Sequence, residues 1–441
     1  MTDREAALAI WQAALAAGDV APLLRAAFTP DGRALLLGSR RLDLADFDRI
    51  LVLGCGKASG AMARAVETIL GGRIDGGFVV VKDGYRAATR IVEVSEAGHP
   101  VPDTRGQAAS RRLLELAAGA GPDALVLFLV SGGGSALTPA PAPPVTLAEK
   151  QAVTRLLLAA GAPIGELNAV RKHLSLFKGG GLARGAAPAT VVTLALSDVI
   201  GDALDVIASG PTAPDPTTFD DALEVLNRRG VTDQVPAPVI ERLRAGARAE
   251  IAETPKPGDP VFSRVTNVVL GNNRLVTDAA VAAAERFGYR ARLLTRELQG
   301  EAREVARDLV AQARRLPRPA CLVAGGETTV TVRGRGKGGR CQEFALAAAL
   351  ELTPADGLVV LAAGTDGTDG PTEAAGGLVD AGTVERGARA GAEARAALAD
   401  NDAHGFLART GDLVVSGPTN TNLLDLYIVL APSAQRMSEA V

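Results

Sequence analysis

Three loops of this sequence combine glycines with side chains that can hold an anion. The first is LGCGKASG at residues 53–60, where Lys57 stands among the glycines. Backbone N–H groups at a helix start favour anions, and glycines let a phosphate approach them. A Walker A loop is excluded, because that motif needs glycine where Leu51 stands and serine or threonine where Ala58 stands. We interpret Lys57 as a phosphate-contacting cation, with a surface lysine on a tight turn as the alternative.

The second loop follows the most hydrophobic predicted strand of the chain. Its glycines and hydroxyls offer a row of N–H and O–H donors, which is the arrangement of an oxyanion or phosphate site. A hydrolase nucleophile is a weaker interpretation, because G-x-S-x-G is absent. A plain glycine turn is the remaining alternative. The residues of this loop are Ser131, Gly132, Gly133, Gly134 and Ser135.

The third loop, VRGRGKGGR at residues 332–340, alternates four cations with glycine and leads into a helical run. It predicts a site for a polyanion, with Lys337 and Arg340 as candidate ligands. Nucleic acid would be a competing partner, but no aromatic residue interleaves the cations and the chain is 3% aromatic, so stacking platforms for bases are missing. We expect a small phosphorylated ligand and no nucleic acid. A solvated basic hairpin is the alternative.

Acidic residues follow other predicted strands. Glu327, Asp366 and Asp198 stand just past strand ends, where open α/β sheets place their ligands. Mg²⁺ binds one or two carboxylates together with substrate phosphates. Asp366 and Asp198 are therefore candidate metal ligands, and Glu327 is a candidate substrate or metal ligand. Each single aspartate could instead cap a turn or a helix.

The histidines do not predict a zinc site, because His99, His173 and His404 show no metal-binding spacing. Arg171, which stands beside Lys172 and His173, is a candidate ligand for a substrate carboxylate. The same basic trio could also be the polar face of a helix.

Length and composition restrict the class of protein. The chain has 441 residues, 47% hydrophobic and 22% charged, which excludes wholesale disorder and predicts two domains. A net charge of −3 provides no field that would recruit nucleic acid or an anionic membrane. Cys55, Cys321 and Cys341 show no C-x-x-C spacing and are interpreted as reduced thiols. The first fifteen residues are typical of an amphipathic helix rather than a signal peptide. We expect a cytoplasmic protein with no membrane segment, as a monomer or a homodimer.

Short apolar runs alternate with helical segments, the pattern of an α/β protein with largely parallel sheets. Thr146 and Glu149 form a capping box that predicts a helix start. Prolines punctuate residues 241–262, so we predict domains at 1–240 and 263–441 joined by this segment. The predicted strands are Ile50–Leu53, Gly77–Lys82, Ala124–Val130, Thr190–Leu196, Thr266–Leu270, Tyr289–Leu294, Ala320–Ala324, Thr328–Arg333, Gly357–Ala363, Asp412–Val415 and Leu424–Leu430, the pair at 320–333 being antiparallel.

Taken together, the motifs of both halves resemble the class II glycerate 2-kinase family. That family has an N-terminal glycerate kinase domain and a C-terminal domain called MOFRL, and the resemblance runs from about residue 7 to residue 429. Its members were often labelled hydroxypyruvate reductases. The motifs that carry it are LGCGKASGAMA, EAGHPVPD, VSGGGSAL, LNAVRKHLS, LALSDVIGD, ASGPTAPDPTT, AGGETTVTVRGRGKGGRCQEFALA, AAGTDGTDGPTEAAG and SGPTNTNLLD.

The resemblance implies transfer of the γ-phosphoryl group of ATP to the 2-hydroxyl of D-glycerate, with a divalent cation such as Mg²⁺. It implies a Rossmann-like, largely parallel N-terminal sheet, a mixed α/β C-terminal domain and an active site in the cleft between them. The family's catalytic lysine and arginine fall on Lys57 and Arg340, and associated polar residues fall on Glu327, Asp366 and Asn422. Cys341 departs from the pattern, which has a polar residue beside the arginine.

Two other functions stay open from the sequence. An NAD(P)H-dependent hydroxypyruvate reductase would use residues 54–60 as a dinucleotide loop, which needs an acid at the end of the second strand. Asp75 has the right distance along the chain but stands in a glycine turn, and the second strand ends nearer Asp83. A non-catalytic regulator that binds a sugar acid or a nucleotide would explain the glycine loops and cations, but would not need acids opposite them.

Overall fold

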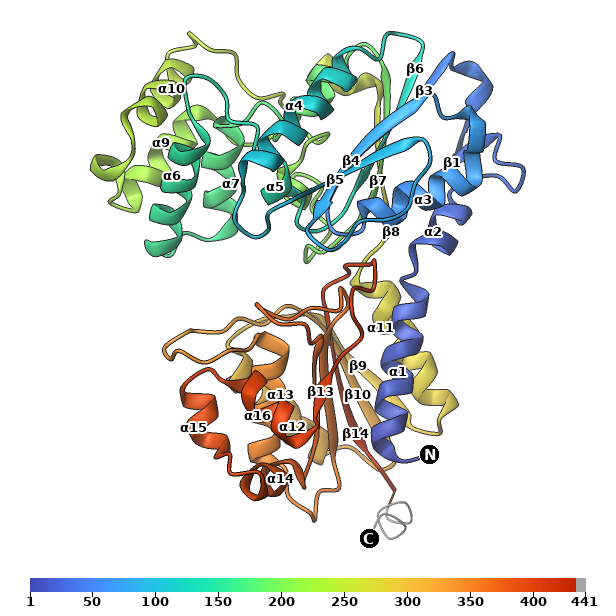
Figure 1. Cartoon of the computed structure of the whole chain (residues 1–441), viewed down its shortest axis with the longest axis vertical. Helices are drawn as coiled ribbons and strands as arrows, with labels where there is room; N and C mark the ends of the chain where they lie inside the picture. The colour runs from blue at the N-terminus through green and yellow to red at the C-terminus, as the bar shows by residue number, and fades with distance from the viewer. Residues whose placement is uncertain (434–441) are drawn as a thin grey trace. The chain divides into compact units, whose positions relative to one another are not determined.

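The structure is a computed structural model that describes residues 1–433. It packs into two compact units, which we call the first unit (Val20–Leu270) and the second unit (Met1–Asp19 together with the chain from Gly271). Each unit holds a six-stranded sheet with helices packed on it (Figure 1). The predicted α/β class with two domains is therefore confirmed.

The sheet of the first unit has the strand order β5-β4-β3-β6-β7-β8. The strands from β5 to β7 are mutually parallel, as predicted. Its central strands are almost free of charge and buried on both faces, as parallel strands between helical layers must be. The strands of this unit are β1 (Ala34–Leu37), β2 (Arg40–Asp43), β3 (Arg49–Cys55), β4 (Gly76–Lys82), β5 (Val92–Ala97), β6 (Ala124–Val130), β7 (Thr190–Leu196) and β8 (Val265–Gly271).

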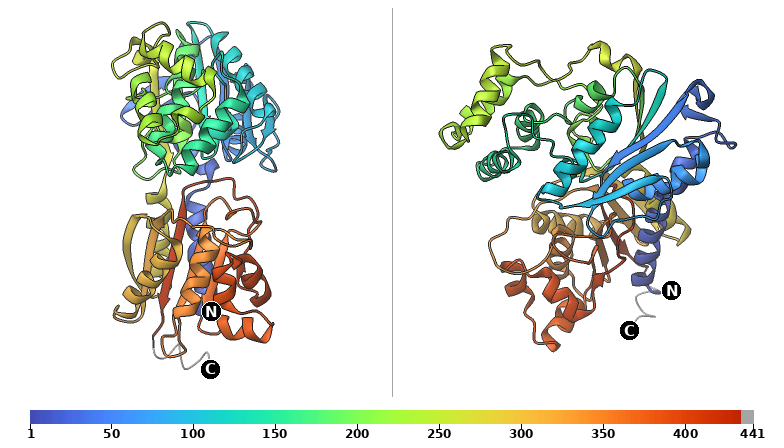
Figure 2. Two further views of the ribbon diagram at one scale, coloured as in Figure 1. Left: turned by 90° about the vertical axis from the view of Figure 1, so that its left-hand side faces the viewer. Right: turned by 45° about the horizontal axis from the view of Figure 1, so that its top comes forward.

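The helices of the first unit bury two separate apolar clusters. One packs against the sheet. The other lies among α6, α7, α9 and α10, which form a group of their own beside the sheet (Figure 2). The capping box of Thr146 and Glu149 is present at the start of α6. The helices are α2 (Val20–Ala26), α3 (Ser59–Leu70), α4 (Thr104–Ala118), α5 (Gly134–Leu137), α6 (Leu147–Ala159), α7 (Ile164–His173), α8 (Gly181–Ala186), α9 (Phe219–Arg228) and α10 (Ala237–Ala247).

The sheet of the second unit is mixed, with the order β13-β12-β11-β14-β10-β9. Among the described strand pairs of this sheet, only β9–β10 is parallel. The strands are β9 (Arg290–Leu298), β10 (Ala320–Gly326), β11 (Val359–Gly364), β12 (Gly376–Asp380), β13 (Leu413–Val414) and β14 (Asp425–Ala431). The helices are α1 (Asp3–Ala17), α11 (Asn273–Arg286), α12 (Ala302–Arg314), α13 (Arg340–Glu351), α14 (Thr383–Arg389), α15 (Ala394–Ala399) and α16 (Ala403–Thr410).

The prediction of one strand is wrong. Residues Thr328–Arg333 do not form a strand, and β10 pairs with β14 and β9 instead of with them. The segment touches Glu301 through a single bridge at Thr329, and the Glu301 carboxylate accepts the N–H of Thr331. A side chain thus takes the place of a neighbouring strand. The sequence analysis also missed β1, β2, β5 and β12.

The boundaries of the two units in the sequence differ from the predicted domain boundaries. The proline-rich segment 241–262 is not an open connection, because α10 extends into it and the carbonyl of Pro255 accepts the N–H of Asp215 at 2.9 Å. Strand β8 joins the first sheet, so the division falls at about residue 270. At the other end, α1 belongs to the second unit.

Helix α1 lies along α11 (Figure 1). Its apolar face, which includes Ile10 and Trp11, is buried, and Arg4 forms ion pairs with Asp380 at 2.5 Å and Asp412 at 2.7 Å. Within the described residues, Asp3–Ala26 is the one helical stretch whose length and composition would suffice to cross a membrane. In this structure the α1 part of that stretch packs on the second unit.

We expect Ile10→Ala to destabilise the second unit by about 2–4 kcal/mol, because Ile10 is fully buried and the cavity would be lined by rigid neighbours. Hydrogen exchange followed by mass spectrometry checks this. Exchange should rise in peptides of α11 while peptides of β3 and β6 stay unchanged. A rise confined to the first unit would contradict the assignment of α1 to the second.

Candidate functional site

The first two glycine loops leave neighbouring strands at the same edge of the first sheet. Cys55 at the end of β3 is paired with Val130 at the end of β6. The loops then bond to each other, with the N–H of Lys57 donating to the carbonyl of Gly132 and the N–H of Ala58 donating to the Ser131 hydroxyl, both at 2.9 Å. Sheet register therefore brings the predicted lysine loop and the predicted serine loop together.

Gly56 shows why this contact needs glycine. Its φ is +129°, and a Cβ there would lie 2.3 Å from Ser131 Oγ and 2.4 Å from the Ser131 carbonyl oxygen. The same contact gives Ser131 its observed role. It is fully buried and its hydroxyl holds the lysine loop, so Ser131 positions Lys57. Close to it, a Cβ on Gly133 would lie 3.5 Å from Lys57 Cγ.

Ser135 is the centre of a polar cluster in the same unit. Its hydroxyl accepts from Arg171 Nη2 at 2.5 Å and from Lys178 Nζ at 2.8 Å, and it lies 2.8 Å from the Ser209 hydroxyl. Arg171 lies in the last turn of α7, and Lys178 lies in the turn that follows the helix. The structure thus brings together two predicted residues, Ser135 and Arg171, and adds Lys178, which the sequence analysis did not name. The only signal for Lys178 was that three glycines follow it.

Asp198 follows β7, the strand next to β6. Its position past a strand end agrees with the prediction, and it lies on the same sheet edge as the loops that carry Lys57 and Ser131. Carboxyl edges of parallel sheets are the usual ligand sites of this fold class.

In the second unit, Arg340 is the first residue of α13 and is held by two carboxylates. Its Nε and Nη2 donate to the two oxygens of Asp425 at 2.5 and 2.9 Å, and its Nη1 lies 2.9 Å from Glu327 Oε1. Burial alone would lower the pKa of Arg340, but the charge of Asp425 raises it well above its usual value. The guanidinium is therefore a permanent, oriented positive charge whose side chain keeps 33% of its exposure.

Asp425, the partner of Arg340, was not named as a candidate in the sequence analysis, although it ends the quoted motif SGPTNTNLLD. It begins β14, where it pairs with Gly326 of β10 on one side and Gly364 of β11 on the other. Glu327 directly follows β10, so the sheet register itself places both carboxylates beside Arg340. The Tyr427 hydroxyl also donates to Asp425, at 3.1 Å.

The basic glycine loop does not offer its backbone to a phosphate along its first half. The amides of Arg333 and Gly334 donate to Asn401 Oδ1 at 2.8 and 2.9 Å, and that of Arg335 donates to Asp400 at 2.9 Å. The glycines are explained by this packing, since a Cβ on Gly334 would lie 2.2 Å from the Asp400 carbonyl oxygen. Lys337 also uses its amide within the unit, toward Asp402, and its exposed ammonium lies 3.6 Å from Glu373.

Asp366 and Asn422 lie at the same edge of the second sheet as Asp425. Asp366 follows β11, and its Oδ1 accepts the N–H of Thr368 at 2.9 Å. A Cβ on Gly364 would be 3.4 Å from a carboxylate oxygen of both Asp366 and Asp425, so the two carboxylates flank this glycine. Asn422 is buried, in the segment just before β14.

The described residues hold no group of three His, Cys, Asp or Glu side chains placed to bind one metal ion. Mg²⁺ that arrives on a nucleotide needs only one or two protein carboxylates, because the phosphates supply other ligands. Asp366 in the second unit and Asp198 in the first have the chemistry for that smaller role.

The buried position of Cys341 accounts for its departure from the family pattern. It is fully buried in the apolar core of the second unit, beside Phe344 and Ala345. Its side chain thus contributes to packing, and burial raises the pKa of its thiol well above the usual value. Cys55 and Cys321 are likewise buried and unpaired.

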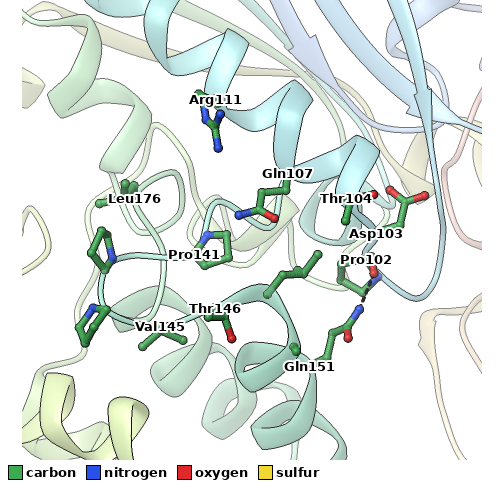
Figure 3. A pocket seen from close by; sticks show the side chains of 14 residues that line it. Pro102, Asp103, Thr104, Gln107, Arg111, Pro141, Val145, Thr146, Gln151 and Leu176 are labelled. Carbon is green, nitrogen blue, oxygen red and sulfur yellow. Dashed lines mark hydrogen bonds between the residues drawn. The ribbon is translucent and has the colours of Figure 1, made fainter.

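A groove of about 950 Å³ lies beside α4 in the first unit (Figure 3). Arg111 and Gln107 project into it from α4, opposite Pro141. Gln151 closes one end by donating to the carbonyl of Pro102 at 2.7 Å. A smaller cavity next to it shares Gln151 and Pro102 and also contains Ser135 and Arg171. The smaller cavity is thus the one that includes predicted site residues.

Asp369 predicts a pH dependence of stability. Burial, and then the charge of Asp425, raise the pKa of Asp369 to about 6. The pKa of this carboxyl in the unfolded chain is near 4, so between about pH 4 and pH 6 the folded chain keeps a proton that the unfolded chain has lost. The free energy of unfolding therefore falls as the pH rises through this range. Asp369→Asn carries no such proton. We expect the variant to gain about 2 kcal/mol relative to the wild type between pH 4.5 and 7.5.

Thermal melts of both proteins across this pH range check the expectation, with Asp308→Asn, a change on the surface of α12, as the control. A difference between wild type and D369N that stays constant with pH would contradict it.

A domain of unknown function, DUF4147, matches residues 6–244, and the MOFRL family matches residues 320–425. The chain is 44% identical over 393 residues to a D-glycerate 2-kinase of Thermotoga maritima, covering 87% of this chain and 91% of the relative. It is 42% identical over 400 residues to a putative hydroxypyruvate reductase of Agrobacterium vitis, covering 87% of each.

The fold agrees with these matches. A crystal structure of glycerate kinase from Thermotoga maritima is similar with a TM-score of 0.82 and 40% identity, covering 97% of this chain and 99% of that one. Matches of this extent include both units. The chain therefore belongs to the glycerate 2-kinase family.

Proposed function

We propose that this protein is a glycerate 2-kinase, which transfers the γ-phosphoryl group of ATP to the 2-hydroxyl of D-glycerate. The observation that carries the proposal is the 44% identity to a D-glycerate 2-kinase over nine-tenths of that relative's length. The geometry agrees with it. Each unit places a cation at a sheet edge, Lys57 on a loop held by backbone contacts and Arg340 on two carboxylates. Phosphoryl transfer needs positioned positive charge more than covalent catalysis.

Lys57 and Arg340 are proposed to act on the same transferring phosphoryl group. Lys57 is positioned by the paired loops after β3 and β6, and Arg340 by Asp425 and Glu327. A phosphoryl group in flight spreads negative charge over its oxygens, and an oriented guanidinium stabilises that charge without rearranging.

The substrates are proposed to be D-glycerate and the Mg²⁺ complex of ATP. Asp366 or Asp198 would provide the protein carboxylate for the metal, and Asn422, Glu327 and Lys337 would contact substrate groups. The loop Ser131–Ser135 is proposed to contribute through the backbone of Gly132, Gly133 and Gly134. Of these, Gly133 lies beside Lys57, since a Cβ there would be 3.5 Å from Lys57 Cγ. We also infer a cytoplasmic location, because buried unpaired thiols suit a reducing compartment.

A hydroxypyruvate reductase is less well supported by the same loops. Asp75 accepts the N–H of Ile50 at 2.7 Å, which is a structural role in a turn. Asp83, which follows β4, forms two hydrogen bonds with Arg105, at 2.6 and 2.8 Å. A dinucleotide site would need one of these acids for a ribose hydroxyl.

The proposal predicts formation of ADP when the protein is mixed with D-glycerate and Mg·ATP, and no loss of NADH with hydroxypyruvate. The expected product is 2-phosphoglycerate, identified by ³¹P and ¹³C NMR from the carbon that carries phosphorus. Loss of NADH without ADP would favour the reductase. Neither reaction, together with ligand binding, would favour a regulator.

Arg340→Ala should lower kcat by at least about 100-fold and change KM far less, because the guanidinium acts on charge that develops in the transition state. Arg340→Lys should restore the activity only partly, since an ammonium cannot make the forked contact. Steady-state kinetics of both variants check this.

Arg389→Ala is the matched control, because Arg389 is an exposed arginine on α14 paired with Glu385. Its kinetics should equal those of the wild type. Melting curves must show that R340A is folded, because the change leaves Asp425 buried without its partner. A folded R340A with normal kcat would contradict the role of Arg340.

A further inference from the structure

The first unit contains a cavity of about 290 Å³ whose charged wall residues are all cations. It lies between α6, α7 and the segment that contains Ser135 and Pro139. No aspartate or glutamate lines it. The volume is at the lower end of the range of small-molecule pockets, about 300–1,000 Å³, which suits a compact acid better than a nucleoside triphosphate. The cations are Lys150, Arg155, Arg171 and Lys178.

Two of these cations, Lys178 and Lys150, are buried and a third, Arg171, is half-buried, and none of the three has an acidic partner among the described residues. Lys178 is 1% exposed and Lys150 is 5% exposed. Lys178 donates to the carbonyl and hydroxyl of Ser135 at 2.7 and 2.8 Å, and Lys150 donates to the carbonyls of Pro139 and Leu174 at 2.7 and 3.0 Å. Arg171 bonds to the Ser135 hydroxyl. Within the described chain, none of the three forms an ion pair.

Lys172 is an internal comparison for this cluster. It is as deeply buried, at 2% exposure, but its ammonium lies 3.1 Å from Asp205 and 3.2 Å from Asp215. The fold thus supplies two carboxylates to this buried lysine. It supplies none of the described carboxylates to Lys150, Arg171 or Lys178, although burying an unpaired charge is costly.

The cations also keep donors that the described residues do not use. An ammonium has three N–H donors and a guanidinium has five. Lys178 and Lys150 each spend two on the protein, and Arg171 spends one. Ser135 has no capacity left, because its oxygen accepts from both Arg171 and Lys178, and its proton serves Ser209, whose own proton goes to Asn168.

Burial, followed by the charges of the neighbouring cations, lowers the pKa of Lys150 and of Lys178 well below the usual value. An anion in the cavity would reverse this effect by favouring the charged ammonium groups. An arginine fork and two ammonium groups in an enclosed site are the chemistry that recognises a carboxylate.

We propose that this cavity, with Arg171, Lys178 and Lys150, binds the carboxylate of the hydroxy-acid substrate. The inference rests on the proposed function, which supplies D-glycerate as the acid. The cavity residue Ser135 belongs to the same loop as Gly133, where a Cβ would lie 3.5 Å from Lys57 Cγ. One loop therefore links the site for the carboxylate to the lysine proposed to act on the phosphoryl group, and binding at the first positions the acid for reaction at the second.

The test is isothermal titration calorimetry of Lys178→Met with two probes, D-glycerate alone and a non-hydrolysable Mg·ATP analogue alone. Loss of a charge-assisted hydrogen bond should weaken binding of D-glycerate by about 10- to 100-fold. Affinity for the nucleotide should change less than about twofold. Glycerol, which lacks the carboxylate, should not compete with D-glycerate. Arg111→Met, in the neighbouring groove, is the control with the same loss of charge and should change neither affinity.

Other outcomes would overturn the inference. Weaker binding of the nucleotide with unchanged binding of D-glycerate would make the cavity a phosphate site. Unchanged binding of both probes, or no binding of D-glycerate to the wild type, would remove the anion site. If wild type and K178M phosphorylate glycerate equally well, the inference fails while the proposed function stands. If D-glycerate binds as expected but no ADP forms, the proposed function fails.

Stability gives an independent readout. Replacing a buried, unpaired cation by an apolar side chain of similar length should leave the melting temperature of the ligand-free protein unchanged or raise it. D-Glycerate should then raise the melting temperature of the wild type more than that of K178M. Lys150→Met serves as a second variant with the same expected pattern. A lower melting temperature together with unchanged affinity would show that these lysines only support the fold.

Discussion

Fixed positive charge is the constraint on which the architecture of both units depends. A phosphoryl group that moves between two oxygen atoms must be met by cations that are already in place. The second unit meets this need by placing Asp425 between Gly326 and Gly364, so that a buried carboxylate orients Arg340. The first unit meets it by backbone contact, since the absence of a side chain at Gly56 lets two loops join beneath Lys57.

Much of this organisation could be predicted from local sequence. The parallel strands β6 and β7 are continuous apolar runs whose predicted limits match the structure, and the capping box of α6 was evident from Thr146 and Glu149. The contact between the Lys57 loop and the Ser131 loop follows from the same logic, because residues just past parallel strand ends gather at one sheet edge. Family resemblance, rather than spacing, supplied the reaction and the 2-hydroxyl acceptor.

The parts that could not be predicted depend on contacts between distant segments. Residues 328–333 alternate like a strand, yet Glu301 satisfies the amide of Thr331 with its side chain. The glycines at 334 and 336 looked like a phosphate loop, but they make room for Asp400 and Asp402. Lys178 has no motif of its own, and its burial beside Arg171 becomes visible only when α6, α7 and the Ser135 loop are assembled. Likewise, nothing local assigns α1 to the second unit.

The account depends most on the claim that Lys57 and Arg340 act together on one phosphoryl group. A double-mutant cycle of Lys57→Ala and Arg340→Ala, read as kcat/KM for D-glycerate phosphorylation, tests it most directly. Groups that act as a unit give strongly non-additive losses. We predict that the double variant loses little more activity than the worse single variant. Losses that multiply fully, as for independent sites, would contradict the account.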